Sequence, residues 1–463
     1  MHSPFTHFFF TWALLLLVRR SIALENGLAR QVPPLNSSNR LFRTPPMGWM
    51  SWTRFLCQID CARHPHSCIN EQLYREHGDR LVADGYKASS KKKRTFLIFV
   101  VQAVGYDTIH VDDCWSERAR DSWNRLVADR WRFPSGMWGL GSYLHSRGLK
   151  FGLYGDYGTL TCEKYPGTMG FEKVDADTFA SWGVDYLKLD GCNSNYYQME
   201  TGYPLFGRYL NASGRPIVYS CSWPAYWADR PHLVKFDLIS RHCNLWRNEA
   251  DISSTWSSML GIINTFVRKQ DTLIPISGPG RWHDPDMLVI GNPGITEGMS
   301  RVQMSVWSIW SAPLIMSNDL RNIRPAFRSI LQNTRVIAVD QDPMGRMGRM
   351  VWRTPQLMYF VKQVVPVVSG QFSYAVAIIN YSGRPATASF MLSTLGLTNP
   401  NGYVLLNLWT GAQEGFRRSG DWYQAVVPAQ DAQMFKATAV PPSSPRVAPA
   451  EFHRRRAAGR FHA

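Results

Sequence analysis

The feature that most constrains the fold of this chain is an alternation of short apolar runs with helical stretches between Thr44 and Asp342. Each run is rich in β-forming residues, ends in polar or charged side chains, and is followed by residues with helical periodicity. Such an alternation predicts a parallel sheet, either a (β/α)8 TIM barrel or a doubly wound sheet. The clearest runs are residues 108–111, 149–154, 184–189, 216–220 and 287–290.

Polar side chains gather where these predicted strands end. The strand-end residues include Asp112, Asp113, Tyr154, Asp156, Asp190 and Ser222. In a (β/α)8 barrel the carboxyl ends of all the strands meet on one face, so residues far apart in sequence would surround a single pocket. No G-x-G-x-x-G motif follows the first strand, which disfavours a dinucleotide-binding fold. We therefore predict a catalytic (β/α)8 barrel over residues 24–344.

After Gly345 the pattern changes to alternating apolar and polar residues separated by turn residues. Residues 375–379 and 403–406 are examples of predicted strands in this part. The pattern is typical of antiparallel sheets, and we predict a C-terminal antiparallel β-sandwich domain over residues 345–440. Residues 441–463 are rich in proline and arginine and are predicted to be disordered.

The N-terminus has the features of a secretory signal peptide. An apolar run from Phe8 to Val18 precedes small residues near Ala23, so residues 1–23 are predicted to be the signal. Arg19 and Arg20 follow the apolar run rather than precede it, which leaves an uncleaved signal anchor as an alternative. No later segment is long and apolar enough to span a bilayer. We therefore expect entry to the secretory pathway without stable membrane insertion.

Two further features agree with that pathway. The chain has eight cysteines, an even number, as expected in an oxidising compartment, although sequence alone allows 105 pairings of them. Acceptor sequons for N-glycosylation occur at Asn36, Asn211 and Asn380.

The formal charge of +16 would by itself suggest an acidic partner such as nucleic acid. The basic residues do not form a helical stripe, however. Several lie in a run at residues 91–94 and in the tail at residues 454–460. We therefore predict no nucleic-acid partner.

Two aspartates are candidates for acid–base and nucleophilic work. Asp190 follows a predicted buried strand and lies close in sequence to Lys188, whose positive charge would keep it ionised. Asp251 is the best candidate for its partner. Glycosidases need two carboxyl groups that flank the scissile bond. From spacing alone, a helix cap or an ion pair explains either aspartate as well as catalysis does.

Seven motifs, in order along the chain, resemble those of glycoside hydrolase family 27, which comprises α-N-acetylgalactosaminidases and α-galactosidases. They are TPPMGWMSW (44–52), VDDCW (111–115), GLYGDYG (152–158), YLKLDGC (186–192), YSCSWPAY (219–226), NLWRNEAD (244–251) and GPGRWHDPDMLVIGN (278–292). The resemblance implies a retaining exo-glycosidase with Asp190 as the nucleophile and Asp251 as the general acid/base. It implies no metal and no cofactor, a lysosomal location and a homodimer. The implied sugar-binding residues are Trp52, Asp112, Asp113, Tyr154, Lys188, Ser222, Ala225, Tyr226, Arg247, Asp286 and Met287.

The resemblance also has consequences for specificity and for the cysteines. Family members that act on galactose carry Glu and Leu near the sugar's C2 substituent, where this chain has Ser222 and Ala225. Short side chains there would leave room for an acetamido group, so we expect preference for N-acetylgalactosamine with residual α-galactosidase activity. The natural aglycone stays open. The implied disulfides are Cys57–Cys114, Cys61–Cys68, Cys162–Cys192 and Cys221–Cys243.

The chain departs from the family pattern at several places. His283 replaces an asparagine, and Glu249 replaces an aromatic residue near Asp251. A carboxylate that faced Asp251 would raise its pKa, but we expect Glu249 to point outward. His283, Asp284 and Asp286 together also permit a metal-site interpretation, which Pro285 and the lack of further ligands disfavour.

Two stretches, residues 31–43 and 88–102, interrupt segments that the family runs together. We hypothesise that one or both are retained introns, which sequencing of the transcript would test.

Two rival functions remain from the sequence alone. The first is an enzyme that acts mainly as an α-galactosidase. The second is a galactose-binding protein that has kept the pocket and lost turnover, which the presence of both Asp190 and Asp251 disfavours.

Overall fold

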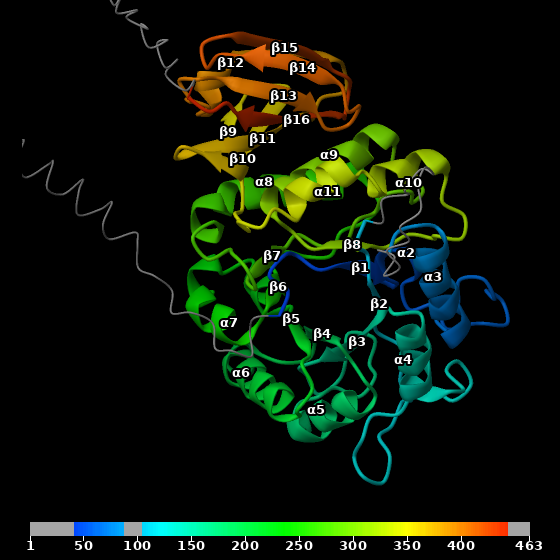
Figure 1. Ribbon diagram of the computed structural model, residues 1–463. Helices are drawn as coiled ribbons and strands as arrows, with labels where there is room; N and C mark the ends of the chain where they lie inside the picture. Colours follow the sequence, from blue (N-terminus) through cyan, green and yellow to red (C-terminus); the bar gives the residue numbers. More distant parts are fainter. Residues whose placement is uncertain (1–40, 88–103, 443–463) are drawn as a thin grey trace, which may run out of the picture.

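The computed structural model describes residues 41–87 and 104–442. The predicted signal peptide, most of the insertion at 31–43, the insertion at 88–102 and nearly all of the tail at 441–463 lie outside the described residues. Two units follow one another along the chain, a barrel built from β1 to β8 and an antiparallel β domain that packs on its helices α8, α9 and α11 (Figure 1).

The barrel strands are parallel and lie in sequence order around the ring. They are β1 (Met47–Met50), β2 (Thr108–Val111), β3 (Lys150–Asp156), β4 (Tyr186–Asp190), β5 (Val218–Cys221), β6 (Leu245–Arg247), β7 (Trp282–Asp284) and β8 (Leu314–Met316). Hydrogen-bonded pairs run without a break from β7 down to β1 and then to β8. Leu288 joins the two ends, because it forms a parallel bridge with Met316 of β8. The predicted (β/α)8 fold is confirmed.

One strand prediction was wrong. Residues 287–290 form no regular strand, and β7 lies earlier, at Trp282–Asp284. The apolar run is nevertheless fully buried, and only Leu288 pairs with a neighbouring strand. An apolar run marks burial, and burial alone does not distinguish a strand from a packed connection.

Helices surround the barrel on its outside. They are α2 (Trp52–Phe55), α3 (Glu71–Ala83), α4 (Gly136–Ser146), α5 (Glu172–Ser181), α6 (Tyr196–Ala212), α7 (Phe236–His242), α8 (Trp256–Leu273), α9 (Glu297–Trp310), α10 (Pro325–Leu331) and α11 (Thr334–Asp340), with 3₁₀ turns η2 (Trp223–Trp227) and η3 (Pro231–Leu233) after β5.

The sequence of α8 shows why these segments form helices. The Thr255 side chain caps its first turn by accepting from the Ser258 amide. Its buried residues Met259, Ile262 and Phe266 recur at helical spacing and face the barrel.

The C-terminal domain consists of a six-stranded antiparallel sheet and a two-stranded one. The larger sheet has the order β14-β13-β16-β11-β10-β9, and the smaller pairs β12 with β15. The strands are β9 (Arg349–Arg353), β10 (Leu357–Val368), β11 (Gln371–Asn380), β12 (Ala386–Met391), β13 (Tyr403–Asn407), β14 (Gln413–Arg417), β15 (Trp422–Val427) and β16 (Ala432–Ala439), with a 3₁₀ turn η4 (Leu392–Leu395).

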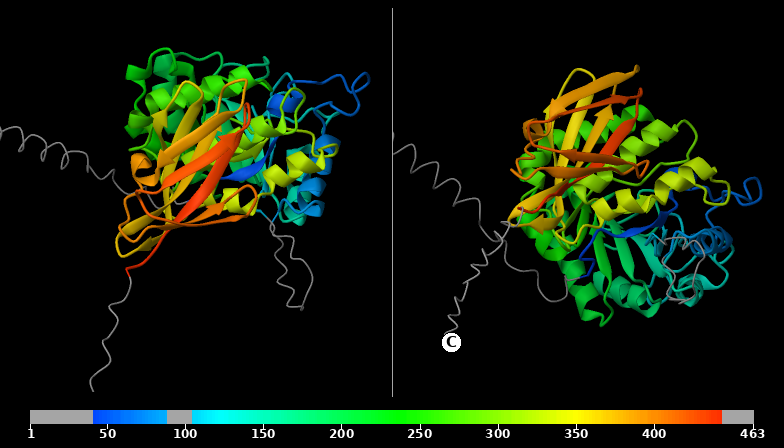
Figure 2. Two further views of the ribbon diagram at one scale, coloured as in Figure 1. Left: turned by 90° about the horizontal axis from the view of Figure 1, so that it is seen from above. Right: turned by 45° about the horizontal axis from the view of Figure 1, so that its top comes forward.

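The large sheet lies between the barrel helices and the smaller sheet (Figure 2), and its middle strands are buried on both faces, as alternation along β10 shows. Met358 and Phe360 belong to the core shared with the barrel helices, whereas Leu357 and Tyr359 belong to a second core beneath β12 and β15. Successive side chains in a strand point to opposite faces, so one strand joins both cores. The first core holds the domain against the barrel, and the second core holds the two sheets of the domain together.

The structure contains four disulfides, which join Cys57 to Cys114, Cys61 to Cys68, Cys162 to Cys192 and Cys221 to Cys243. These are the pairs that the resemblance implies. The sequons differ in exposure: Asn211 is exposed at the end of α6, whereas Asn380 is fully buried and its amide donates to two backbone carbonyls. In the folded protein Asn380 therefore cannot carry a glycan.

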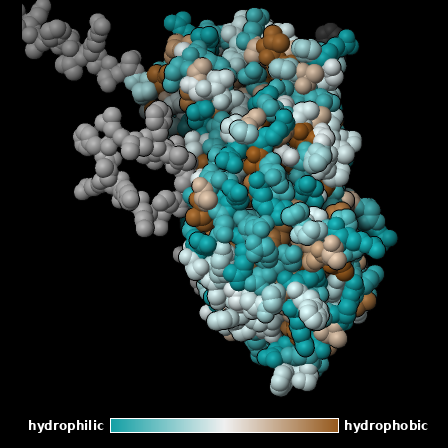
Figure 3. Space-filling view, turned by 90° about the vertical axis from the view of Figure 1, so that its right-hand side faces the viewer, coloured by the Kyte–Doolittle hydropathy of each residue, from teal (hydrophilic) through white to brown (hydrophobic). Residues whose placement is uncertain are grey.

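The surface seen in Figure 3 is mainly hydrophilic, with apolar side chains scattered singly. Among the described residues, none of the helices combines the length and the apolar character that a bilayer crossing requires.

Candidate active site

A cavity of about 310 Å³ opens at the carboxyl ends of the barrel strands. Its lining comes from segments that span about two hundred residues of sequence. The lining residues are Trp52, Asp112, Asp113, Tyr154, Cys162, Asp190, Cys192, Ser222, Ala225, Tyr226, Arg247, Glu249, Ala250 and Asp251. This is the face on which a (β/α)8 barrel carries its site. Most of the sequence-predicted site residues are thus brought together, and Lys188, Asp286 and Met287 lie outside the lining.

Asp190 is the last residue of β4 and is held by two hydrogen bonds. The Tyr226 hydroxyl donates to Oδ1 over 2.6 Å, and the Gly191 amide donates to the same oxygen over 3.1 Å. In the described part of the chain, both hydrogen bonds that Asp190 accepts fall on Oδ1. The carboxylate is therefore oriented by one oxygen while the other is available to react.

Asp251 follows β6 and also lines the cavity, and its side chain is 55% exposed. Its Oδ2 accepts from the Trp52 indole over 2.9 Å, and its Oδ1 accepts from Arg247 over 3.0 Å. Burial by itself would raise the pKa of Asp251, but the charges of Arg247 and Lys188 outweigh it and lower the pKa below its usual value. These charges therefore favour the carboxylate form of Asp251.

Lys188 is buried behind the lining and is surrounded by carboxylates. Its Nζ forms an ion pair with Asp112 Oδ2 at 2.8 Å. Burial alone would lower the pKa of Lys188, but the negative charges of Asp112, Asp190 and Asp251 raise it, so the lysine stays charged. The sequence argument paired Lys188 with Asp190; in the structure its direct partner is Asp112, and Asp190 feels its charge from further away.

Asp113 follows Asp112 and has a different role. Its carboxyl accepts from the backbone amides of Cys114 over 2.6 Å and Glu163 over 3.2 Å. Burial and the charge of Asp112 raise the pKa of Asp113 to about 6. At acidic pH this group is protonated, so it can then donate a hydrogen bond to a sugar hydroxyl.

Arg247 connects Asp251 to a buried aspartate beneath the cavity. Its guanidinium lies 3.0 Å from Asp286 Oδ2 as well as 3.0 Å from Asp251 Oδ1. Asp286 has a backbone φ of 85°, which is strained for a residue with a side chain and typical of functional positions. Burial raises the pKa of Asp286 to about 7 despite the opposing charge of Arg247. Met287 is buried and its sulfur contacts Thr53 rather than the cavity.

The wall beside Asp190 contains Tyr154, Asp156 and the Cys162–Cys192 disulfide. The Tyr154 hydroxyl donates to Asp156 Oδ2 over 3.2 Å, and the Cys192 amide donates to the same oxygen over 3.1 Å. Burial and the charge of Asp190 raise the pKa of Asp156 well above its usual value. Asp156 was noted at a strand end in the sequence but was not assigned to the site. Its position in GLYGDYG was the available signal.

Ser222 and Ala225 lie in the cavity lining, and neither has a long side chain. Ser222 follows β5 and Ala225 belongs to the 3₁₀ turn η2, which the Cys221–Cys243 disulfide anchors at its start. Tyr226, the next residue of this turn, is the donor to Asp190. One short segment therefore supplies Ser222 and Ala225, which form a wall of small side chains (the small wall), and Tyr226, which orients Asp190.

Glu249 and Ala250 were not predicted as lining residues. The Glu249 carboxylate forms an ion pair with Lys269 of α8 at 2.5 Å. The pKa of Asp251 is lowered rather than raised, and the charges that lower it are those of Arg247 and Lys188. The ion pair with Lys269 neutralises the extra carboxylate at this edge.

The possible metal ligands of the HDPD segment are otherwise engaged. His283 is buried, with Nε2 donating to the Leu273 carbonyl over 2.9 Å and Nδ1 accepting from the Trp246 indole over 2.9 Å. Both ring nitrogens are occupied, and burial lowers the pKa of His283 to about 3. A second possible group, Asp156 with Cys162 and Cys192, contains cysteines already joined as a disulfide.

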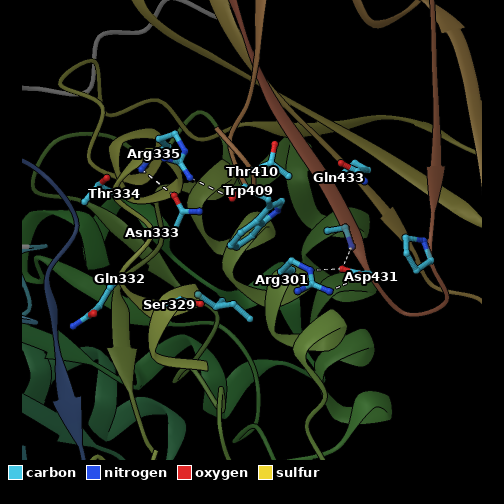
Figure 4. A pocket seen from close by; sticks show the side chains of 13 residues that line it. Arg301, Ser329, Gln332, Asn333, Thr334, Arg335, Trp409, Thr410, Asp431 and Gln433 are labelled. Atoms are coloured by element: carbon cyan, nitrogen blue, oxygen red, sulfur yellow. Dashed lines mark hydrogen bonds and ion pairs between the residues drawn. The ribbon is translucent and has the colours of Figure 1, made fainter. Parts of the chain in front are cut away.

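A larger cavity, of about 690 Å³, lies between the barrel helices and the β domain (Figure 4). Its polar groups bind mainly to one another across the domain boundary. Arg301 of α9 makes a bidentate contact with Asp431, and Arg335 donates to the backbone carbonyls of Leu408 and Trp409. Its size exceeds that of the carboxylate-lined cavity, but its chemistry is that of a domain interface.

Buried carboxylates around an exposed acid, at the mouth of a (β/α)8 barrel, define the site of a carbohydrate-processing enzyme. Residues 44–342 match the family model described as alpha galactosidase A, and residues 364–437 match the alpha galactosidase C-terminal beta sandwich domain. The chain belongs to this family, glycoside hydrolase family 27, and is a glycoside hydrolase.

Similar proteins of known identity agree. An α-N-acetylgalactosaminidase from Gallus gallus is 42% identical over 87% of this chain and 92% of its own length. The α-N-acetylgalactosaminidase of Homo sapiens is 44% identical over 79% of this chain and 84% of its own length, and alpha-galactosidase A of Homo sapiens is 41% identical over 81% and 80%. The crystal structure of alpha-galactosidase I from Mortierella vinacea superposes with a TM-score of 0.74 at 27% identity, covering 88% of this chain and 100% of that one.

Proposed function

We propose that this chain hydrolyses terminal α-linked N-acetylgalactosamine, with some activity on α-linked galactose, and that it retains the anomeric configuration. The observation that carries the proposal is the small wall made by Ser222 and Ala225 beside the carboxylate pair of the cavity. The relatives with the highest identities reported above bear the name α-N-acetylgalactosaminidase, which supports the same specificity.

The proposed mechanism is a double displacement by two aspartates. The free oxygen of Asp190 attacks C1 of the sugar while the C1–O bond to the aglycone breaks. Asp251 gives its proton to the departing oxygen. In the second step Asp251 takes a proton from water, the water oxygen bonds to C1, and the C1–Asp190 bond breaks. Tyr226 and the Gly191 amide hold the leaving Asp190 carboxylate through their hydrogen bonds to Oδ1.

The acid step requires protonated Asp251, whereas Arg247 and Lys188 lower its pKa. The fraction of enzyme that carries the proton therefore falls as pH rises. We expect kcat/KM to decrease on the alkaline side of an acidic optimum. This behaviour suits an acidic compartment, and we propose a secreted route to the lysosome for this chain.

The experiment compares hydrolysis of nitrophenyl α-N-acetylgalactosaminide and nitrophenyl α-galactoside by the purified protein at acidic pH. Asp190→Asn is the test of the nucleophile, and Asp177→Asn, at an exposed position of α5, is its matched control. We expect preference for the acetamido sugar, loss of both activities in Asp190→Asn and no change in Asp177→Asn. A preference for galactoside would overturn the specificity, and absence of both activities from well-folded protein would favour the binding-only alternative.

A second arm tests the small wall directly. Ala225→Leu fills the space proposed for the acetamido group, so the ratio of acetamido to galactoside kcat/KM is expected to fall by roughly tenfold or more. An unchanged ratio would mean that Ala225 does not face the C2 substituent. We also propose a homodimer, on the resemblance alone, which light scattering on the purified protein would test.

A further inference from the structure

Three exposed tryptophans lie in the segment that joins β2 to α4 and in the first turn of α4. Trp123 is 70% exposed, Trp131 94% and Trp138 64%. The cyan loop of this segment projects from the side of the barrel that lies away from the β domain (Figure 1). Within the described segment 117–138, each large apolar side chain that is exposed is a tryptophan. A folded chain gains stability by burying such rings, so a group of them left in water is typical of a binding surface.

A cavity of about 350 Å³ lies beside these tryptophans, between the β2–α4 segment and the end of α5. Its lining combines the indole rings of Trp138 and Trp182 with polar side chains that include Asp121, Arg125 and Ser181. A cavity of this volume, with rings and a few polar groups, is typical of small-molecule sites. It shares no lining residue with the active-site cavity, and the reaction proposed above uses none of its side chains.

The other two exposed tryptophans flank residues of this lining. The guanidinium carbon of Arg125 lies 4.8 Å from the centroid of the Trp123 ring. Trp131 directly follows Arg130, which also lines the cavity. The three rings and the cavity therefore belong to one surface.

Hydrogen bonds fix the backbone that carries these rings. Asp121 Oδ1 accepts from the amides of Trp123 over 2.9 Å and Arg125 over 2.8 Å, and Asp121 Oδ2 accepts from the Arg125 side chain over 2.8 Å. Asp129 accepts from the Trp131 amide over 3.0 Å in the same way. A ring on a fixed backbone loses little conformational freedom when it binds, so this surface is preorganised.

Neighbouring carboxylates balance the cations of this surface. Arg125 forms an ion pair with Asp121 at 2.8 Å, and Arg130 Nε lies 4.0 Å from Glu117. An acidic polymer or an anionic lipid surface requires basic residues whose charge is not already balanced. The paired charges also interrupt the apolar surface, whereas a membrane-binding face is continuous. The chemistry therefore favours a ligand that is neutral and carries both apolar faces and hydroxyl groups.

We propose that the tryptophan surface, formed by Trp123, Trp131, Trp138 and the cavity beside them, binds a neutral glycan chain. A hexopyranose ring presents a face of C–H groups and an edge of hydroxyls. The C–H face packs on an indole ring, while the hydroxyls accept from Arg125 and donate to Asp121. A glycan chain held at this second site raises the local concentration of chain ends at the active-site cavity. Binding here is independent of which sugar the chain hydrolyses.

Affinity electrophoresis tests the proposal, in gels that contain galactomannan or desialylated mucin. The Asp190→Asn protein is used so that the polymer is not consumed, and free galactose and N-acetylgalactosamine saturate the active-site cavity. We expect at least one polymer to retard this protein. Adding Trp123→Ala and Trp131→Ala together should weaken the apparent affinity about tenfold or more, because both rings leave the contact. Trp422→Ala, which removes a tryptophan of β15 that is 61% exposed, is the matched control and should leave the affinity unchanged.

Trp138→Ala tests the cavity rather than its rim and should also weaken the retardation. The retardation should persist at roughly 0.5 M salt, because salt does not screen binding to a neutral ligand. Loss of retardation at that salt would show a charged ligand and overturn the proposal. Absence of retardation by either polymer, retardation that survives in all the tryptophan variants of this surface, or equal loss in Trp422→Ala would also overturn it. So would binding to anionic phospholipid vesicles without retardation by either polymer.

A kinetic comparison separates this surface from the reaction. In the active protein, Trp123→Ala with Trp131→Ala should raise KM severalfold for release of sugar from desialylated mucin. The same pair should leave kcat/KM for the nitrophenyl glycosides unchanged, because a small substrate does not reach the second site. If the protein hydrolyses no glycoside, the proposed function fails, and the electrophoresis still decides whether the tryptophan surface binds glycans.

Discussion

Lys188 and Lys362 are the two buried lysines of the described residues, and their environments are opposite. Lys188, at the carboxyl face of the barrel, is surrounded by negative charge from Asp112, Asp190 and Asp251, which raises its pKa against the effect of burial. Lys362 of β10 lies at the boundary between the barrel and the β domain, where burial lowers its pKa to about 8.

The hydrogen-bond partners of Lys362 explain the contrast. Its Nζ donates to the Ser308 carbonyl over 3.1 Å, to the Ser311 hydroxyl over 2.7 Å and to the Val339 carbonyl. These partners are neutral, and burial raises the pKa of the nearby Asp340 to about 8. A buried lysine that is held by carboxylates is typical of a reactive site, whereas a buried lysine that is held by neutral oxygens is typical of a structural contact between domains.

Lys188→Met should have the largest effect of the changes considered, because it leaves three neighbouring carboxylates without their shared cation. We expect kcat/KM to fall by about a hundredfold or more and the protein to lose roughly 3–5 kcal/mol of stability. Kinetics and chemical denaturation measure the two quantities. Lys173→Met, at an exposed position of α5, is the control and should change neither.

Phe435→Ala tests whether the β domain acts only through stability. Phe435 is fully buried in the second core, so its removal is expected to destabilise the protein by about 3–5 kcal/mol. KM measured well below the melting temperature should be unchanged, because no residue of this core lines the active-site cavity. A large rise in KM would show that the domain shapes the site and would break the contrast between the regions.

The pH dependence of stability tests the same comparison through two buried carboxyls, Asp286 near the active-site cavity and Asp340 at the boundary between the domains. Asp286 and Asp340 have pKa values raised to about 7 and about 8, mainly by burial, against about 3.9 in an unfolded chain. Between pH 6.5 and 8 the folded state therefore holds protons that the unfolded state has released, so stability falls as pH rises. The buried histidines His110 and His283 are neutral in the folded state, because burial lowers their pKa to about 3, whereas an unfolded histidine has a pKa of about 6.5. They therefore oppose this trend near pH 6.5, and Lys362, whose pKa burial lowers to about 8, opposes it near pH 8.

The carboxyls outweigh these opposing groups, so we expect a net loss of roughly 1 kcal/mol between pH 6.5 and pH 8. Thermal or denaturant unfolding at each pH measures this loss. Asp340→Asn should flatten the upper part of this curve without changing activity. A curve that rises across the window would mean that these carboxyls are ionised in the folded protein.

Lys362→Met should have the smallest effect. Its removal leaves Asp340 protonated below about pH 8, so no uncompensated charge remains, and a hydrophobic replacement of a buried charge is often neutral. We expect a stability change within about 1–2 kcal/mol and unaltered kcat/KM, measured beside Lys188→Met under identical conditions. Loss of activity from Lys362→Met would remove the distinction between the two lysines.

The sequence by itself determined the architecture and indicated which polar side chains would gather at one face of the barrel. The alternation of apolar runs and helices predicted the barrel, because each strand must be buried and each helix must cover it with one face. The strand-end carboxylates Asp112, Asp113 and Asp190 then had to meet, since parallel strands end on one side. The alternating runs in β11 and β13 likewise predicted the C-terminal sheet.

Only the tertiary structure decided which residues are partners. Lys188 pairs with Asp112 rather than Asp190, and Glu249 turns to Lys269 of α8 rather than to Asp251. The apolar run 287–290 is buried as a connection instead of a strand. The physical reason is that a local pattern reports burial, periodicity and charge, whereas contacts between distant segments depend on how the elements pack.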